Sequence, residues 1–206
     1  MTALLIDLDG VIYEAEEPVP GAAEAIAWLQ DSAIPHLYLT NTTSRPRSAL
    51  VEKLAGMDID VAEESILTPP VAAARWLAEH APGPGALFVA PKTVPEFGSL
   101  EVATNDQESV ASVVVGDYGE RWSFFELNRA FRLLMVEPRP TLVALGMTRY
   151  WRAEDGLRLD TAPFVMALAH AGGVEPVVLG KPARPFFETA LAMLDPHVLI
   201  FESGGA

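Results

Sequence analysis

The chain has 206 residues, of which 50% are hydrophobic, with a mean hydropathy of +0.23 and a formal net charge of −14 at pH 7. This composition is typical of a globular protein of one large domain or two small ones, and it excludes a disordered chain. The negative charge argues against nucleic acid or an anionic membrane as a partner, so an anionic substrate needs a metal ion or specific Lys and Arg side chains. The absence of cysteine excludes disulfides, thiolate metal sites and cysteine nucleophiles.

The amino-terminal segment does not have the pattern of a signal peptide or of a membrane span. Its only apolar run, 3–6, is short and is interrupted by Asp7. We therefore expect a cytoplasmic protein that has no membrane partner.

The first seventy or so residues alternate between predicted strands and helices. Apolar runs predict short buried strands, and the helices have apolar residues at helical spacing. The predicted strands are 3–6, 36–39 and 66–68, and the predicted helices are 22–31 and the segment after Pro46. This βαβαβ order predicts an α/β fold with a parallel sheet and right-handed crossovers.

The middle of the chain has the pattern of a second α/β unit. Its predicted strands are 86–90, 110–115 and 141–145. Ser123 and Glu126 have the spacing of a capping box at the start of a helix, and Thr161 is a candidate cap for another. If the apolar strand 110–115 lies at a sheet edge, it could pair across a homodimer.

The pattern of the first unit returns near Pro176, with a helix expected over 184–194 and a strand over 198–201. A doubly wound sheet places such a returning strand beside its first strand. We therefore expect a core made of residues 1–78 and 177–206, with an inserted α/β unit of residues 79–176.

Side chains suited to phosphate chemistry follow the predicted strands of the core. Asp7 and Asp9 follow the first strand, Thr40 and Asn41 follow the second, and Lys181 opens the segment after the insertion. Ligands of open α/β sheets bind at the carboxyl ends of the strands. Each feature also has a plainer explanation: an acidic turn, a helix cap and a solvated loop lysine. Together they predict a phosphoryl-transfer site.

The chemistry of such a site needs these residue types. A carboxylate nucleophile can take the phosphoryl group, and a second carboxylic acid can protonate the leaving oxygen and then activate water. A hydroxyl, backbone amides, an ammonium group and Mg²⁺ can stabilise the charge on the phosphoryl oxygens.

The sequence resembles the haloacid dehalogenase superfamily. The segments 7–11, 39–43 and 180–182 are similar to its first three motifs, and they occur in the order and spacing of the class IIA members. The resemblance covers essentially the whole chain. It implies a Rossmann-like parallel-sheet core with an α/β cap inserted between the second and third motifs.

The resemblance also implies a role for each motif residue. Asp7 would be the nucleophile and a Mg²⁺ ligand, and Asp9 the general acid and base whose backbone carbonyl binds the metal. Thr40 and Asn41 would bind the phosphoryl group, and Lys181 would hold nucleophile and phosphate together.

The fourth motif of the family is an acidic pair that supplies further Mg²⁺ ligands, and more of the core follows it. Here the last predicted strand leads into Glu202, which is the only carboxylate in register, and the sequence given ends at Ala206. We therefore expect Glu202 as a third metal ligand in a core that is shortened at its carboxyl end.

These observations predict a Mg²⁺-dependent phosphatase of small phosphorylated compounds that acts through an aspartyl phosphate. The alternative is a non-catalytic remnant or interaction protein that has lost the fourth motif. We expect the inserted unit to select the substrate, with Asp117 and Tyr150 as candidate residues, although Asp117 also fits an exposed turn. The motifs do not identify the substrate.

Overall fold

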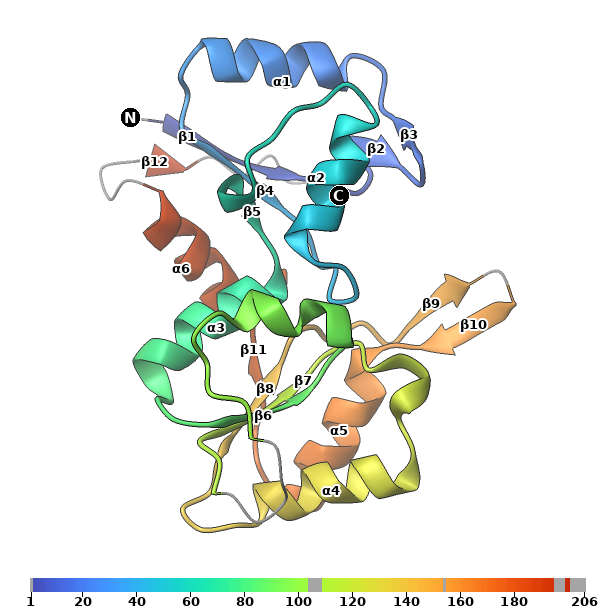
Figure 1. The fold of residues 1–206 in the computed structure, drawn as a ribbon, viewed down its shortest axis with the longest axis vertical. Helices are drawn as coiled ribbons and strands as arrows, with labels where there is room; N and C mark the ends of the chain where they lie inside the picture. Colours follow the sequence, from blue (N-terminus) through green and yellow to red (C-terminus); the bar gives the residue numbers. More distant parts are fainter. Residues whose placement is uncertain (1, 104–108, 154, 195–198, 201–206) are drawn as a thin grey trace.

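A computed structural model describes residues 2–103, 109–153, 155–194 and 199–200. The described residues form two four-stranded parallel sheets and two short hairpins (Figure 1). The first sheet has the strand order β12 (Leu199–Ile200), β1 (Thr2–Asp7), β4 (His36–Leu39) and β5 (Ile66–Leu67). The second has the order β11 (Val177–Val178), β8 (Thr141–Ala144), β7 (Ser112–Val115) and β6 (Gly85–Phe88).

The first sheet is covered by helices on both faces, as its apolar sequence predicts. Because successive side chains of a strand point to opposite faces, neighbouring residues pack against different helices. Tyr38 packs with α1 (Ala22–Asp31) and α2 (Arg47–Ala55), whereas Leu37 and Leu39 pack with α3 (Pro69–His80) and α6 (Arg184–Met193). This packing fixes the carboxyl ends of β1 and β4 side by side.

The second sheet is also covered on both faces. One face packs against α4 (Phe124–Leu134) and α5 (Thr161–Gly172). The other packs against α3 and the 3₁₀ helix η2 (Pro91–Phe97). Helix α3 lies between the sheets, because Val71 and Ala72 pack with the first and Ala73 and Leu77 with the second (Figure 1).

The parallel α/β fold expected from the sequence is confirmed. The chain builds β1, β4 and β5, continues through the second sheet, and returns to the first through α6 and β12. Strand β12 pairs in parallel with β1, with Thr2 opposite Leu199, as expected for the returning strand.

Two expectations about strands need correction. Segment 177–178, which we assigned to the core, pairs in parallel with β8 in the second sheet as β11. Strand β7 is paired on both sides, by β6 and β8, so it does not lie at an edge. An interior strand has no free hydrogen-bonding groups with which to pair across a dimer.

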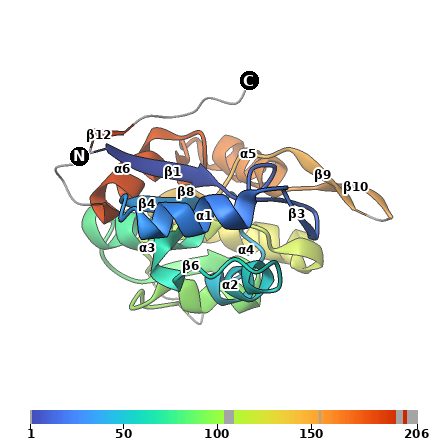
Figure 2. The same cartoon turned by 90° about the horizontal axis from the view of Figure 1, so that it is seen from above.

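Two hairpins lie outside these sheets. Strands β2 (Tyr13–Glu14) and β3 (Glu17–Pro18) follow the first motif, in a segment for which the sequence predicts no strand. Strands β9 (Tyr150–Ala153) and β10 (Gly156–Leu159) form a longer hairpin that projects from the body in both views (Figures 1 and 2). Within the described ranges, no helix is both long and apolar enough to span a bilayer.

Candidate active site

A cavity of about 570 Å³ brings together residues from both sheet units. Five of its lining residues are those that the sequence predicted for the site: Asp7, Asp9, Thr40, Asn41 and Lys181. Others, which include Asp117, Trp151 and Asp160, come from the second sheet unit. The sixth predicted residue, Glu202, lies outside the described residues.

The end of β1 fixes the two aspartates. Asp7 is the last strand residue and pairs with Leu39 of β4. Leu8 is fully buried, so the chain is anchored between the two acids. Gly10, with φ of +78°, then turns the chain, and its N–H donates a 2.8 Å hydrogen bond to the Tyr13 carbonyl oxygen. Burial, and then the nearby Asp9, raise the pKa of Tyr13 to about 12, so its hydroxyl is neutral.

Asp7 and Lys181 form an ion pair inside the cavity. The distance from Lys181 Nζ to Asp7 Oδ1 is 2.5 Å, and the two side chains are 16% and 45% exposed. Asp7 and Asp9 line the same cavity, where two like charges are costly without a cation, and the ammonium group supplies one. The third motif therefore reaches the first, as the sequence predicted, although Lys181 follows a strand of the second sheet.

Thr40 and Asn41 follow β4, beside the aspartates. Thr40 is buried, and its Oγ1 accepts a 3.1 Å hydrogen bond from the Thr42 N–H. Asn41 is exposed at the cavity, and both ends of its amide contact the main chain of Lys181. Its Oδ1 accepts from the Lys181 N–H at 2.7 Å, and its Nδ2 donates to the Lys181 carbonyl oxygen at 3.0 Å.

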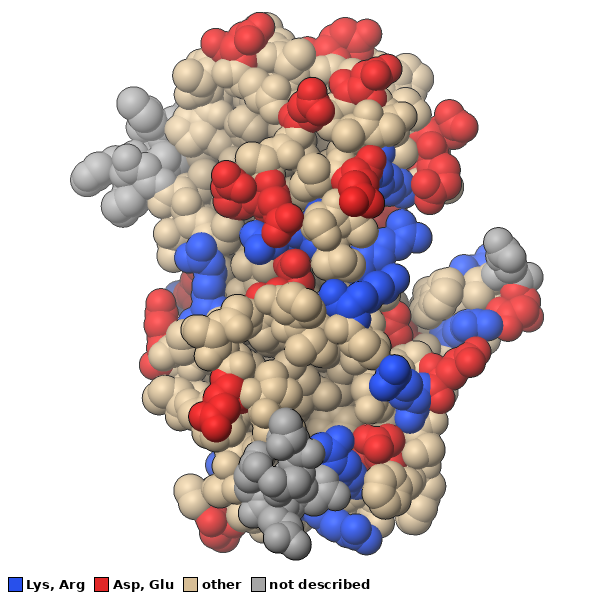
Figure 3. All heavy atoms as spheres, viewed as in Figure 1, with Lys and Arg blue, Asp and Glu red and all other residues tan. Residues whose placement is uncertain are grey.

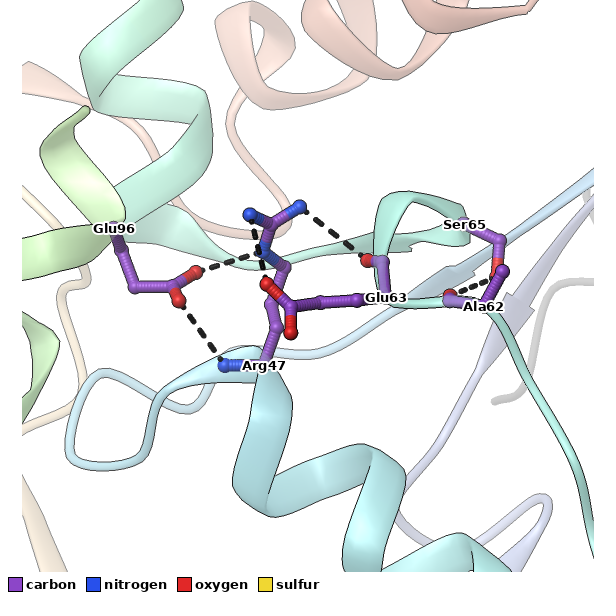
Figure 4. A network of polar contacts seen from close by, with 5 residues as sticks. All are labelled: Arg47, Ala62, Glu63, Ser65 and Glu96. Atoms are coloured by element: carbon purple, nitrogen blue, oxygen red, sulfur yellow. Dashed lines mark hydrogen bonds and ion pairs between the residues drawn. The ribbon is translucent and has the colours of Figure 1, made fainter. Parts of the chain in front are cut away.

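A partly buried ion pair holds the segment that leads from Thr40 into α2 (Figure 4). Arg47, the first residue of α2, donates from Nε to Glu96 Oε2 at 2.8 Å and from its backbone N–H to Glu96 Oε1 at 3.4 Å. Arg47 also lies 3.3 Å from a carboxylate oxygen of Glu63. Because Glu96 belongs to η2, these contacts join the motif segment to the second sheet unit.

A second cavity, of about 350 Å³, adjoins the first and shares Asp117, Trp151 and Asp160 with it. Its wall includes Trp122, whose ring stacks on Phe164 at 4.7 Å between ring centres. The two adjoining cavities together form a cleft. The ion pair of Asp7 and Lys181 lies in one part of this cleft, and the aromatic residues Trp122 and Phe164 line the other. The cleft has room for a phosphoryl group with an organic leaving group attached.

Several of these residues could not be identified from sequence motifs. Trp151 lines both cavities, whereas its neighbour Tyr150, which we had singled out, lines neither. Asp160, not Thr161, is the cap of α5, because its Oδ1 accepts from the Thr161 N–H at 2.7 Å. Burial, together with Asp160, raises the pKa of Asp117 above its usual range.

The distribution of charge fits an anionic ligand despite the net charge of −14. On the face shown in Figure 3, Lys and Arg side chains gather at the junction of the two sheet units, whereas Asp and Glu lie mainly around it. Lys181 and Arg45 are the cationic residues that line the cavity. Local cations of this kind offset the repulsion that the acidic surface exerts on an anion.

The donor set of the cavity fits a divalent metal ion that keeps part of its water shell. The described residues contain no group of three or more His, Asp or Glu side chains that could hold a metal. Asp7 supplies a carboxylate to the cavity, and Mg²⁺ is commonly bound by one or two carboxylates together with waters and substrate phosphate. Oxygen ligands of this kind favour Mg²⁺ or Ca²⁺ over softer metals.

Comparison with known proteins agrees with this geometry. Residues 4–98 match the family model described as haloacid dehalogenase-like hydrolase. The chain is 34% identical over 203 residues to the phospholysine phosphohistidine inorganic pyrophosphate phosphatase of Danio rerio, covering 96% of this chain and 73% of that protein. The chain therefore belongs to the haloacid dehalogenase-like hydrolases.

Solved structures give the same fold. A p-nitrophenyl phosphatase from Archaeoglobus fulgidus superposes with a TM-score of 0.82 at 27% identity, covering 93% of this chain and 73% of that one. A glycerol phosphate phosphatase from Mycobacterium tuberculosis, in complex with calcium, superposes with a TM-score of 0.79 at 25% identity, covering 96% of this chain and 59% of that one. Sequence and structure together place the chain among the phosphatases of this family.

Proposed function

We propose that this protein is a Mg²⁺-dependent phosphatase that hydrolyses small phosphorylated compounds through an aspartyl phosphate on Asp7. The observation that carries the proposal is the ion pair between Asp7 and Lys181 in a cavity that Asp9 and Thr40 also line. This set provides a nucleophile, a second carboxyl group, a cation and a hydroxyl at one place.

The reaction has two steps. A carboxylate oxygen of Asp7 attacks phosphorus, the bond from phosphorus to the leaving oxygen breaks, and Asp9 gives that oxygen its proton. Water then attacks the phosphoryl group on Asp7 while Asp9 takes a proton from the water, which releases phosphate and restores Asp7. Lys181 Nζ and Thr40 Oγ1 stabilise the charge on the phosphoryl oxygens in both steps.

The carboxylate of Asp7 and the backbone carbonyl of Asp9 would hold the metal, with Glu202 as the third ligand proposed from the sequence. When bound, Mg²⁺ would neutralise charge on the phosphoryl oxygens and orient them. Support comes from the donor set of the cavity and from the calcium complex of the glycerol phosphate phosphatase. The relatives do not support the alternative of a non-catalytic interaction protein.

The second sheet unit, which includes β11, would act as the cap that selects substrates, and the core would comprise residues 1–78 and 179–206. The aromatic second cavity supports this role, because it can receive a leaving group. The names of the relatives include phosphoamino acids, pyrophosphate and glycerol phosphate as compounds acted on, and we propose substrates of this size. We also propose that the enzyme is cytoplasmic and has no nucleic-acid or membrane partners. A homodimer through the cap is a further proposal, which light scattering tests.

A chromogenic phosphate ester assay tests the proposal most directly. The purified protein is stripped of metal with a chelator, and phosphate release is measured with and without added Mg²⁺. We expect hydrolysis that returns only with the metal. Hydrolysis that is equally fast without metal contradicts the Mg²⁺ requirement, and no hydrolysis of any small phosphate ester or anhydride contradicts the phosphatase assignment.

A further inference from the structure

The side chain of Asn41 is committed to the main chain of a residue 140 positions away. Its Oδ1 accepts from the Lys181 N–H at 2.7 Å, and its Nδ2 donates to the Lys181 carbonyl oxygen at 3.0 Å. Both distances are those of well-formed hydrogen bonds. A side chain that makes both contacts fixes the position and the rotation of the segment that it holds.

We propose that Asn41 is a positioning residue that acts through Lys181, and not a residue that binds the phosphoryl group itself. The inference rests on the proposed function of the cavity and differs from the role that the family resemblance implies for Asn41. Its basis is the use of the amide: Oδ1 and one of the two Nδ2–H groups bind the main chain of Lys181, which fixes the orientation of the Asn41 side chain.

We call the two hydrogen bonds between the Asn41 side chain and the Lys181 main chain the clamp. The need for this clamp follows from the flexibility of the Lys181 side chain. A lysine carries its charge at the end of a flexible four-carbon stem, so the ammonium group has many accessible positions. Here it lies 2.5 Å from Asp7 Oδ1 with its side chain only 16% exposed. Stabilisation of the transition state depends on charges that are already in place before the reaction, so a fixed backbone for Lys181 has catalytic value.

The residue before Lys181 shows that the close approach is built into the loop. A Cβ atom on Gly180 would lie 2.5 Å from the Leu145 carbonyl oxygen and 3.3 Å from Asn41 Oδ1. The first of these distances is far inside van der Waals contact with backbone that cannot easily move. Glycine is therefore required for the loop to reach Asn41, and Gly180→Ala offers a second way to disturb the same clamp.

The clamp also joins the two sheet units. Asn41 follows β4 of the first sheet, and Lys181 follows β11 of the second. The catalytic lysine is thus delivered from one unit to a nucleophile carried by the other. The two hydrogen bonds of Asn41 set the position of the lysine at that junction.

A double-mutant cycle tests the inference with four proteins: the parent, Asn41→Ala, Lys181→Ala and the double variant. The kcat and KM for a chromogenic phosphate ester and the affinity for inorganic phosphate are measured for each. With Lys181 present, we expect Asn41→Ala to lower kcat about tenfold to a hundredfold, the loss expected for a displaced catalytic group. In the Lys181→Ala background the same change should cost less than about twofold, because the group it positions is gone.

An equal fold-loss in both backgrounds overturns the inference, because it shows that Asn41 contributes independently of Lys181. Gly180→Ala should reproduce the kcat loss of Asn41→Ala, and it keeps the test decisive if the Asn41 variants fold poorly. If the parent does not hydrolyse the ester, the proposed function fails, whereas the cycle in phosphate affinity, measured by calorimetry, still judges the inference. If Asn41→Ala weakens phosphate binding equally in the Lys181→Ala background, that result contradicts the inference.

Discussion

The backbone N–H of Asp117 donates a 3.3 Å hydrogen bond to Thr43 Oγ1, which joins the end of β7 to the motif segment after β4. Thr43 is buried, and Asp117 lies at the boundary of the two cavities. Asp117 and the aspartates of the first sheet line the same cavity. The carboxyl group of Asp117 is half-buried and close to Asp160.

This position predicts that Asp117→Asn stabilises the protein at neutral pH. Burial and Asp160 raise the pKa of Asp117 above the ordinary 3.8, so the charged form is disfavoured in the folded state. At pH 7 the parent is destabilised by the charge, and the amide removes that cost. We expect a rise in Tm of about 1–3 °C at pH 7, reduced by the partial exposure of the group.

The pH dependence separates this cause from a packing effect. As the pH falls through the raised pKa toward 3.8, the carboxyl of the parent takes up a proton and the advantage of the amide is lost. The Tm values of the parent and Asp117→Asn should therefore differ at pH 7 and converge near pH 4. Asp60→Asn, at an exposed position outside the helices and strands, is the matched control and should change neither curve. A gain that is the same at both pH values contradicts the electrostatic explanation.

Asp7→Asn should abolish turnover while the fold remains intact. The amide is nearly isosteric but is not a comparable nucleophile, and we expect kcat to fall by at least about a thousandfold. The change also removes the partner of the Lys181 ammonium group, but it relieves repulsion from Asp9. Phosphate release measured beside a melting curve tests both parts. Turnover near the rate of the parent shows that Asp7 is not the nucleophile.

Lys181→Ala should lower kcat more than it raises KM. The ammonium group meets charge that concentrates on the phosphoryl oxygens during transfer, so its loss weakens the transition state more than the bound substrate. Steady-state kinetics of Lys181→Ala and Lys181→Arg give the comparison, and the arginine variant should recover part of the rate because it restores the charge. A change confined to KM means that Lys181 only attracts substrate.

The ion pair of Arg47 should contribute unequally through its two carboxylates. The Glu96 side chain is 7% exposed and that of Glu63 is 44% exposed. Glu96→Ala leaves the backbone N–H and Nε of Arg47 without their partners, and we expect a loss of roughly 1–3 kcal/mol in the free energy of unfolding. Glu63→Ala, the matched control, should cost less than about 1 kcal/mol. Urea titration measures both, and equal losses contradict the role given to burial.

Much of the fold could be predicted because local patterns and packing agree here. The helix expected at 22–31 and the strand expected at 36–39 have those bounds in the structure, since apolar residues recur at the helical or strand period in each. Ser123 is also confirmed as the N-cap of α4, because its Oγ accepts from the Glu126 N–H at 3.2 Å. Asp7, Asp9, Thr40 and Asn41 meet in one cavity because they follow the neighbouring parallel strands β1 and β4, whose carboxyl ends lie together.

The rest depends on contacts that no local pattern reveals. The assignment of segment 177–178 failed because a two-residue strand has no period, so only its pairing with β8 decides its sheet. The partners of Asn41 and Arg47 lie 140 and 49 positions away, and a motif gives no information on such contacts. The strands of hairpin β9–β10 were not predicted, since they are exposed and lack an apolar face toward the core.

That hairpin provides a sharp test of the cap. Trp151 lines both cavities, but the preceding Tyr150 lines neither, because consecutive side chains of a strand point to opposite faces. The two residues are similarly exposed, at 45% and 51%, so loss of either ring changes the surface by a similar amount. Tyr150→Ala is therefore a close control for Trp151→Ala.

We expect Trp151→Ala to change substrate preference and Tyr150→Ala to leave it unchanged. Lost apolar contact with an aromatic leaving group should lower kcat/KM for an aromatic phosphate ester about tenfold. Pyrophosphate has no such group, so its hydrolysis should change less than about twofold, and the ratio of the two values of kcat/KM measures specificity directly. If kcat/KM falls equally for both substrates in Trp151→Ala, Trp151 supports closure or folding of the cleft and does not contact the leaving group. If Tyr150→Ala shifts the ratio as strongly as Trp151→Ala, the face of the hairpin that lines the cleft is not the one that selects the substrate.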